Sequence, residues 1–350
     1  MKKQAVKDSA EEPIVREKAV RVKAVRNATT TEPRPSDLVD LTDLDVAERE
    51  AVLELRTVRD LIRWGTSRFV AAGLAFGHGI DNPWDEATTL TLHTLHLPPL
   101  VPDRIGNARV TISERRKVVE LFRRRIAERR PAAYLTQEAW FAGLPFYVDE
   151  RVLIPRSPIA ELIEKGFDPW VTEQQIGRIL DIGTGSGCIA VACALAFPGV
   201  EVDAVDISPD ALEVARINVK RHDVGDQVKL FESDLYRGLG ERCYDLIVSN
   251  PPYVSIAQME TLPAEYRHEP ALGLAAGEQG LDAVLRLLQD ADGHLTPEGV
   301  LVVEVGDSAA ALEERLPEVP FLWLDFERGG GGVFLLTAEQ IHNCRHYFKG

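Results

Sequence analysis

Short apolar runs separated by amphipathic segments dominate the chain beyond residue 175. Five runs of strand length lie near residues 178–181, 201–206, 228–232, 245–249 and 300–305. Strands that alternate with helices form a parallel sheet with helices on both faces. Two further runs flank a glycine cluster and predict neighbouring strands, one of them antiparallel, at residues 321–324 and 333–336. The pattern therefore predicts an α/β fold with a doubly wound, mostly parallel, seven-stranded sheet.

In the first third of the chain, the apolar residues instead recur with the period of a helix. One predicted helix face carries Leu55, Val58, Ile62 and Phe69. A second helix is predicted to open at Asn82, a cap residue followed by a proline. A third starts at the capping box of residues 111–114 and ends before Pro131. This part is therefore a smaller helical domain.

An aromatic, turn-rich stretch joins the two parts. Its alternation predicts a β-hairpin followed by a short helix through Ile159. The N-terminal tail has many charged residues and few large apolar ones, so it cannot bury enough surface to order itself. The expected regions are a disordered tail at 1–35, the helical domain at 36–130, the hairpin and linker helix at 131–165, and the sheet domain at 166–350.

Composition narrows the class of protein. With 45% hydrophobic and 27% charged residues in 350, the chain is typical of soluble globular proteins. No apolar run reaches membrane-spanning length, and no signal-peptide core follows the N-terminus, so we expect a cytoplasmic protein without membrane contact. The cysteines lack metal-ligand spacing, which predicts no metal site and reduced, buried thiols at Cys188, Cys193, Cys243 and Cys344.

The net charge of −15 is unevenly distributed. The tail has nine basic and five acidic residues, a net +4, so the rest of the chain carries −19. An acidic body argues against general nucleic-acid binding and suits a basic protein partner. The exception is the basic helix at residues 114–130. Its arginines are interpreted as a solvated helix face, with contact to RNA as the alternative.

A glycine-rich turn follows the first strand of the sheet domain. Such a turn lets backbone N–H groups and a helix N-terminus approach a ligand closely. A dinucleotide fingerprint would require a third glycine at Cys188, whereas the glycine spacing here fits S-adenosylmethionine better. The candidate cofactor-binding residues are Asp181, Gly183, Thr184, Gly185, Ser186 and Gly187.

Acidic residues close the next two strands. Asp206 ends the second strand, where its carboxylate can accept hydrogen bonds from both hydroxyls of a ribose. Asp234, followed by Leu235, comes just after the third strand and can meet the amine of adenine. Each acid alone is equally well explained as a helix cap. Together, at successive strand ends, they predict one crevice.

The fourth strand runs into the most distinctive stretch of the chain, Asn250-Pro251-Pro252-Tyr253. Two prolines remove backbone donors, so the turn offers mainly the Asn250 side-chain oxygen and the Pro251 carbonyl as acceptors. Two acceptors can hold one NH2 group, and Tyr253 adds a flat face for stacking. The alternative is a rigid turn with no further role. Beside a cofactor crevice, we interpret it as a catalytic cradle for a planar nitrogen nucleophile.

At these residues the chain resembles the class I methyltransferases. More closely, residues 52–345 resemble the protein-glutamine N(5)-methyltransferases of the PrmB family, which modify large-subunit ribosomal protein three. The resemblance is carried by residues 77–79, 81–86, 138–141, 147–151, 154–159 and 265–270. It implies S-adenosylmethionine as cofactor and a ribosomal protein as substrate. We expect the N-terminal helices to recognise that substrate.

Two related activities remain as alternatives. The release-factor glutamine methyltransferases share the glycine turn and the Asn-Pro-Pro-Tyr stretch, but typically have Pro-Arg-Pro-Glu-Thr-Glu where this chain has Pro-Arg-Ser-Pro-Ile-Ala at residues 155–160. An adenine-specific DNA or RNA methyltransferase could use the same cradle, yet it would need a basic groove. The expected reaction is therefore methylation of a glutamine in the ribosomal protein.

Overall fold

The computed structural model describes residues 40–99, 102–171 and 176–349. The predicted disordered tail lies outside these residues. The helices and strands of the described residues belong to one compact unit that begins at Leu41. Within the described part of the chain, no helix has both the length and the apolar character needed to cross a bilayer.

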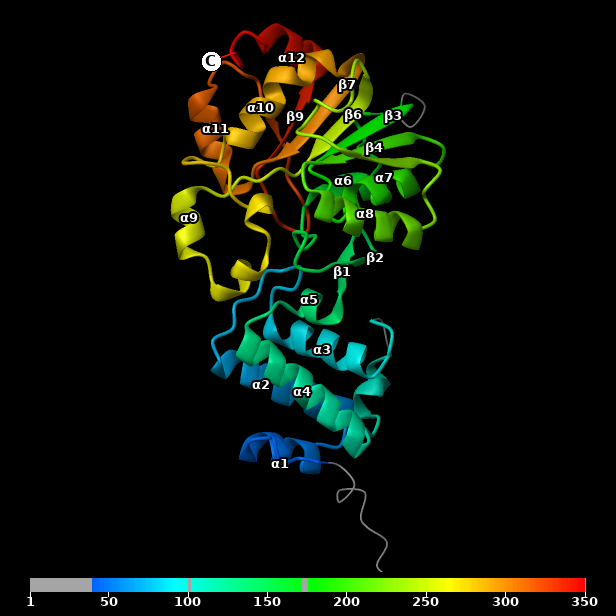
Figure 1. Ribbon diagram of the computed structural model, residues 1–350, viewed down its shortest axis with the longest axis vertical. Coiled ribbons are helices and arrows are strands. Elements are labelled where there is room, and N and C mark those ends of the chain that lie inside the picture. Colours follow the sequence, from blue (N-terminus) through cyan, green and yellow to red (C-terminus); the bar gives the residue numbers. More distant parts are fainter. Residues whose placement is uncertain (1–39, 100–101, 172–175, 350) are drawn as a thin grey trace, which may run out of the picture. The chain divides into compact units, whose positions relative to one another are not determined.

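Helices make up the N-terminal part of this unit (Figure 1). They are α1 (Val46–Glu54), α2 (Val58–Ala71), α3 (Pro83–Thr94), the 3-10 turn η2 (Asp103–Asn107) and α4 (Ile112–Glu128). The predicted caps of α3 at Asn82 and of α4 at Thr111 are confirmed. The placement of Leu55 in one helix with Val58 was wrong, because Thr57 caps a new helix and Leu55 ends the previous one.

The arginines of α4 are mostly engaged within the chain. Arg115 is buried and donates to the backbone oxygens of Val52 and Leu53. Arg125 is fully buried and forms an ion pair with Glu86, with a nitrogen-to-oxygen distance of 2.6 Å. The interpretation of these two arginines as a solvated face was therefore wrong, since each satisfies a buried polar group. Contact of this helix with RNA stays a prediction.

A short connecting region follows. It contains α5 (Ala132–Thr136), the antiparallel hairpin of β1 (Glu138–Phe141) and β2 (Leu144–Tyr147), and α6 (Ile159–Glu164). The hairpin and the linker helix were predicted, whereas α5 was not. Tyr134 in α5 donates its hydroxyl hydrogen to the backbone oxygen of Val152, at 2.6 Å, and so ties this helix to the segment after the hairpin.

The rest of the chain builds a seven-stranded sheet in the order β5-β4-β3-β6-β7-β9-β8. Its strands are β3 (Arg178–Ile182), β4 (Glu201–Asp206), β5 (Val228–Glu232), β6 (Tyr244–Ser249), β7 (Leu295–Glu304), β8 (Leu322–Trp323) and β9 (Val333–Thr337). The first five are parallel, and β9 runs antiparallel to β7 and β8. The predicted sheet is confirmed. Strand β7 begins earlier than expected because Leu295 pairs with Tyr244.

Helices cover both faces of this sheet (Figure 1). Alternate strand residues separate into two apolar clusters, as expected for a sheet buried on both sides. One cluster includes residues of α6, α7 (Cys188–Ala196) and α8 (Pro209–Arg221), and the other includes residues of α10 (Asp282–Asp290), α11 (Ala309–Arg315) and α12 (Ala338–Cys344). All four cysteines are free, and Cys243 is exposed, contrary to the expectation of burial, because it lies in the loop before β6.

Strand register brings the candidate residues together. Ile182 pairs with Val205 on one side and with Ser249 on the other, so three strands end level with one another. The residues that follow them therefore meet at one edge of the sheet. After β6, a long segment of short helices, α9 (Ile256–Thr261), η4 (Ala264–His268) and η5 (Ala271–Gly273), returns across this edge before α10. We call residues 262–274 of this segment the strap.

Candidate active site

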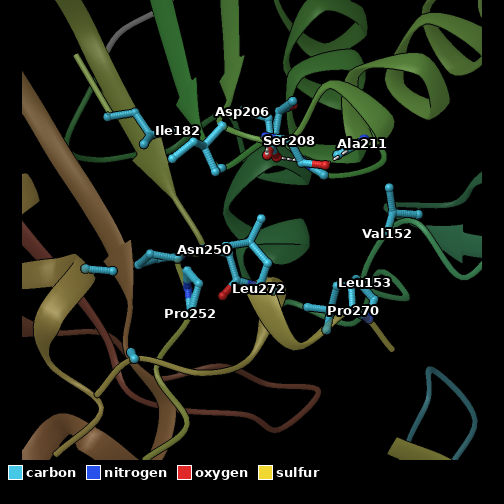
Figure 2. A pocket seen from close by; sticks show the side chains of 18 of the residues that line it. Val152, Leu153, Ile182, Asp206, Ser208, Ala211, Asn250, Pro252, Pro270 and Leu272 are labelled. Carbon is cyan, nitrogen blue, oxygen red and sulfur yellow. Dashed lines mark hydrogen bonds between the residues drawn. The ribbon is translucent and has the colours of Figure 1, made fainter. Parts of the chain in front are cut away.

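A cavity of about 340 Å³ lies at the carboxyl ends of β3, β4 and β6. This is where ligands bind in open α/β sheets. Figure 2 shows Asp206 and Ser208 on one side of the cavity, with Asn250 and Pro252 on another. Of the predicted site residues, those that line it are Gly183, Thr184, Gly185, Ser186, Asp206, Asp234, Leu235, Asn250, Pro251 and Pro252.

Three predicted residues do not line this cavity. Tyr253 lines a second, adjoining cavity. Gly187 packs behind the turn, where an added Cβ would lie 3.2 Å from the Cβ of Ala215, and its φ of +79° favours glycine. Asp181 is fully buried, and its Oδ2 accepts hydrogen bonds from the Thr184 hydroxyl at 2.6 Å and from the Ala190 backbone N–H at 3.1 Å. Both Gly187 and Asp181 shape the turn from behind.

Burial has a marked effect on Asp181. It raises the pKa of this carboxyl to about 7, against the smaller lowering effect of its hydrogen bonds. Its Oδ1 makes no hydrogen bond within the described residues. The carboxyl therefore fastens the glycine turn to the start of α7 at an electrostatic cost when it is ionised.

Asp206 joins two of the loops around the cavity. One carboxylate oxygen accepts from the backbone N–H of Gly185 at 2.8 Å, and the other accepts from Ser208 N–H at 2.9 Å. Burial raises its pKa, and these backbone hydrogen bonds oppose that rise. Two apolar side chains that also line the cavity, Ile207 and Leu272, are about half exposed, at 51% and 57%. They give this cavity exposed apolar surface.

Asp234 has a partner that sequence reasoning missed. Both of its carboxylate oxygens accept from Arg286 of α10, at 2.7 and 2.6 Å, and Arg237 lies 2.9 Å away. Arg286 also lines the cavity. The pair joins residues 52 positions apart, so no local pattern signals it.

The Asn-Pro-Pro-Tyr turn separates the two cavities. Asn250 and Pro251 line both the first cavity and the second one, whose volume is about 330 Å³. Within the described residues, the Asn250 side chain makes no hydrogen bond, so its oxygen is available to a ligand. The second cavity is largely apolar and aromatic, with Phe76, Leu262 and Tyr266 among its walls. The turn thus presents acceptors where the cavities meet.

Arg156 and Glu269 form the main ion pair beside this turn. Arg156 donates to both carboxylate oxygens of Glu269, at 2.6 and 2.9 Å, and its guanidinium lies 5.6 Å from the ring centre of Tyr266. Glu269 also accepts from the backbone N–H of Ile154. Arg156 lines both cavities. Both residues lie in segments that carry the family resemblance, but no spacing rule pairs them.

The strap is also fastened to the N-terminal helices. Glu265 is fully buried and accepts from the backbone N–H of Ala75 at 3.0 Å. Its carboxylate lies 3.6 Å from Arg125 of α4 and 3.5 Å from Arg129. Because strap residues line the second cavity, the helical region contacts a wall of that cavity.

The sheet order and the site define a class of protein. Counted from β3, the strands run 3-2-1-4-5-7-6 with the seventh antiparallel, which is the class I methyltransferase arrangement. Residues 169–265 match the family model described as the methyltransferase small domain. The protein is a class I methyltransferase.

Curated relatives define the family within this class. The chain is 53% identical over 294 residues to the ribosomal protein uL3 glutamine methyltransferase of Xanthomonas campestris pv. campestris, covering 83% of this chain and 95% of that protein. It is 52% identical over 290 residues to the protein of the same name from Bordetella pertussis, covering 83% and 97%. The chain belongs to the ribosomal protein uL3 glutamine methyltransferase family.

Solved structures are more distant. A methyltransferase from Pyrococcus furiosus is 22% identical, with a TM-score of 0.40, and the match covers 56% of this chain and 89% of that one. A ribosomal protein L11 methylase from Lactobacillus delbrueckii subsp. bulgaricus is 21% identical, with a TM-score of 0.37 and coverage of 54% and 83%. The family assignment rests on the curated relatives.

Proposed function

We propose that this protein transfers a methyl group from S-adenosylmethionine to the side-chain amide nitrogen of a glutamine in ribosomal protein uL3. The observation that carries the proposal is the shared wall between the cavities. Asn250 and Pro251 face both, so a cofactor in the first cavity and a side chain in the second would meet at these two residues.

The first cavity suits S-adenosylmethionine in its chemistry. A carboxylate at Asp206 is matched to the two hydroxyls of a ribose, and one at Asp234 to an exocyclic amine. Apolar surface at Ile207 and Leu272 is available for the faces of adenine. When bound there, the cofactor supplies an electrophilic methyl group on a positively charged sulfur.

The turn residues supply nucleophile activation. An amide nitrogen is a poor nucleophile because its lone pair is delocalised into the carbonyl. If the Asn250 side-chain oxygen and the Pro251 backbone oxygen accept hydrogen bonds from its two N–H groups, electron density returns to nitrogen. As the new N–CH3 bond forms, the bond between the methyl group and the sulfur breaks, and one amide proton leaves to water. Holding the two reactants in line adds an effective molarity of roughly 10⁵ M or more.

The same acceptors provide selectivity. A glutamate carboxylate has no N–H to donate and would place its charge against two oxygens. A site built around specific hydrogen bonds rejects an analogue that lacks them by about 10⁴-fold. We therefore propose that glutamine is methylated and glutamate is not. We also propose that the enzyme acts in the cytoplasm, where ribosomal proteins are made.

The proposal is tested by incubating the enzyme with labelled S-adenosylmethionine and purified, unmethylated uL3. A peptide-chain release factor and adenine-containing DNA serve as parallel substrates. Mass spectrometry then maps the methyl group. Label on a glutamine of uL3 alone is expected. Label on the release factor would show that the substrate is the release factor and not uL3. Label on DNA would show that the enzyme methylates adenine and not an amide.

A further inference from the structure

Glu304 is a buried carboxyl that contacts the Asn-Pro-Pro-Tyr turn. It ends strand β7 and is 5% exposed. One of its oxygens accepts from the Tyr253 hydroxyl at 2.8 Å, and the other accepts from the Ser157 hydroxyl at 2.5 Å. Among the described residues no cation forms an ion pair with it, so two neutral hydroxyls satisfy this carboxyl.

The rest of Tyr253 is fixed independently. Ser308 donates its hydroxyl hydrogen to the Tyr253 backbone oxygen at 2.9 Å. The ring packs so closely on Gly306 that a Cβ there would lie 2.6 Å from a ring carbon. With backbone and ring held, Glu304 determines where the hydroxyl hydrogen points.

Glu304 lines neither cavity, whereas Tyr253 lines the second one beside Asn250. Glu304 can therefore act on the reaction only through its two hydroxyl partners, Ser157, which lines the first cavity, and Tyr253. Strand register supports this connection. Ser249 pairs with Val303, so the turn after β6 and the end of β7 lie next to each other.

The charge state of Glu304 decides which bonds it can make. As a carboxylate it accepts from both hydroxyls, but when protonated it carries a hydrogen of its own and one of these bonds must be lost or reversed. Burial raises the pKa of Glu304, while Ser157, Tyr253 and the positive charge of Arg156 lower it. Besides Glu304, the charged groups that act on Tyr253 are Arg156 and Asp307.

We propose that Glu304 is a positioning residue for methyl transfer. Its ionised carboxylate holds the Tyr253 hydroxyl and the Ser157 hydroxyl together, and so fixes the tyrosine beside the amide that enters the second cavity. The inference rests on the proposed function, since it concerns the same reaction. It adds a dependence of turnover on the ionisation of a residue that does not touch the substrate.

The test compares Glu304→Ala and Glu304→Gln in uL3 methylation at saturating cofactor. Alanine removes both bonds, and we expect kcat to fall about 10- to 100-fold, with the cofactor Kd within about twofold of wild type. Glutamine resembles the protonated acid, because it can accept from only one of the two hydroxyls and must donate to the other, so kcat of Glu304→Gln should lie near the low-pH limit of the wild type. Exposed Glu298 of the same strand provides the matched control, Glu298→Ala, with unchanged kcat.

The pH profile separates positioning from simple support of the fold. In the wild type, kcat should fall as pH drops through a pKa above the ordinary value of about 4.3 for glutamic acid. In Glu304→Gln this acid limb should vanish. An unchanged kcat in Glu304→Ala, or an identical acid limb in Glu304→Gln, would overturn the proposal.

Two further measurements keep the result interpretable. If Glu304→Ala unfolds, as judged by its melting temperature, Tyr253→Phe and Ser157→Ala each remove one hydroxyl and test one bond at a time. Tyr253→Phe combined with Glu304→Gln should show a non-additive loss if the two residues act together, and additive losses would contradict this. A wild-type enzyme that does not methylate uL3 would reject the proposed function, whereas a Glu304 variant as active as the wild type would reject only the positioning role.

Discussion

The carboxylate of Asp206 and the backbone N–H of Gly185 are joined by a hydrogen bond of 2.8 Å. The bond connects the end of β4 to the glycine turn after β3, although 21 residues separate the two in sequence. Asp206 therefore has two roles in this account. It orders the turn and offers the carboxylate proposed to bind the ribose.

Replacing Asp206 should weaken cofactor binding more than it affects stability. For Asp206→Ala we expect about 10- to 100-fold weaker binding of S-adenosylmethionine, because hydrogen bonds to a charged group are worth about 1.5–3 kcal/mol. Isothermal titration calorimetry measures the affinity, and thermal unfolding checks the fold. The exposed Asp226 supplies the control variant Asp226→Ala. Equal affinities in Asp206→Ala and wild type would reject the ribose role.

Asn250→Ala should abolish most methyl transfer and leave the fold intact. Its side chain makes no hydrogen bond within the described residues, so the folded protein loses little. The transition state loses an acceptor, which typically costs about 10²-fold or more in kcat. Single-turnover transfer to uL3 is the measurement.

Asn218 provides a comparison for Asn250, because its side chain supports the fold. It is fully buried and exchanges hydrogen bonds with the backbone of Tyr147, so Asn218→Ala should lower the melting temperature. Substantial turnover by Asn250→Ala would show that the Asn250 side-chain oxygen is not needed to activate the amide.

The close packing of Gly306 on Tyr253 predicts a second route to loss of activity. In Gly306→Ala the new methyl group would lie 2.6 Å from the tyrosine ring, and the φ of +47° is unfavourable for alanine. Overpacking of this kind costs about 1–3 kcal/mol or displaces the ring. We expect reduced kcat, measured with saturating uL3. Gly331→Ala meets no atom within 4 Å and should behave as wild type. Full activity in Gly306→Ala would show that the ring position is not critical.

Asp181 predicts a specific dependence of stability on pH. Its pKa is raised from 3.8 to about 7 in the folded state, so folding favours the protonated carboxyl. The stabilisation is present below pH 4 and is lost as pH rises through 7, by up to about 4 kcal/mol. In Asp181→Asn, an amide oxygen can accept the two existing hydrogen bonds. Because the amide does not titrate, the pH-dependent contribution to stability disappears.

Urea unfolding of wild type and Asp181→Asn at several pH values measures the effect. The variant should gain stability relative to wild type as pH rises from 4 to 8. A constant difference across this range would contradict the account.

The sheet and most of the residues that line the first cavity could be predicted because their signals are local. Apolar runs define strands, the glycine turn lies next to the first of them, and parallel strands end at one edge, so Asp206 and Asn250 follow from position alone. The two prolines likewise indicate an acceptor-rich turn without any knowledge of neighbouring elements.

The remaining site features depend on contacts between distant segments. Arg156 meets Glu269 across 113 positions, and Tyr253 meets Glu304 across 51. Nothing near either residue in sequence selects its partner. The same reason explains the error on α4, where the burial of Arg125 depends on Glu86 of another helix.

The proposed selection of a glutamine amide over a glutamate carboxylate can be measured in a single comparison. After the methylated glutamine of uL3 has been mapped, the enzyme is given S-adenosylmethionine with either wild-type uL3 or a uL3 variant in which that glutamine is glutamate. Mass spectrometry then counts methyl groups on the corresponding peptide. We predict one methyl group on the glutamine peptide and none on the glutamate peptide. Comparable methylation of both would show that the oxygens of Asn250 and Pro251 do not select the amide, and would contradict the account.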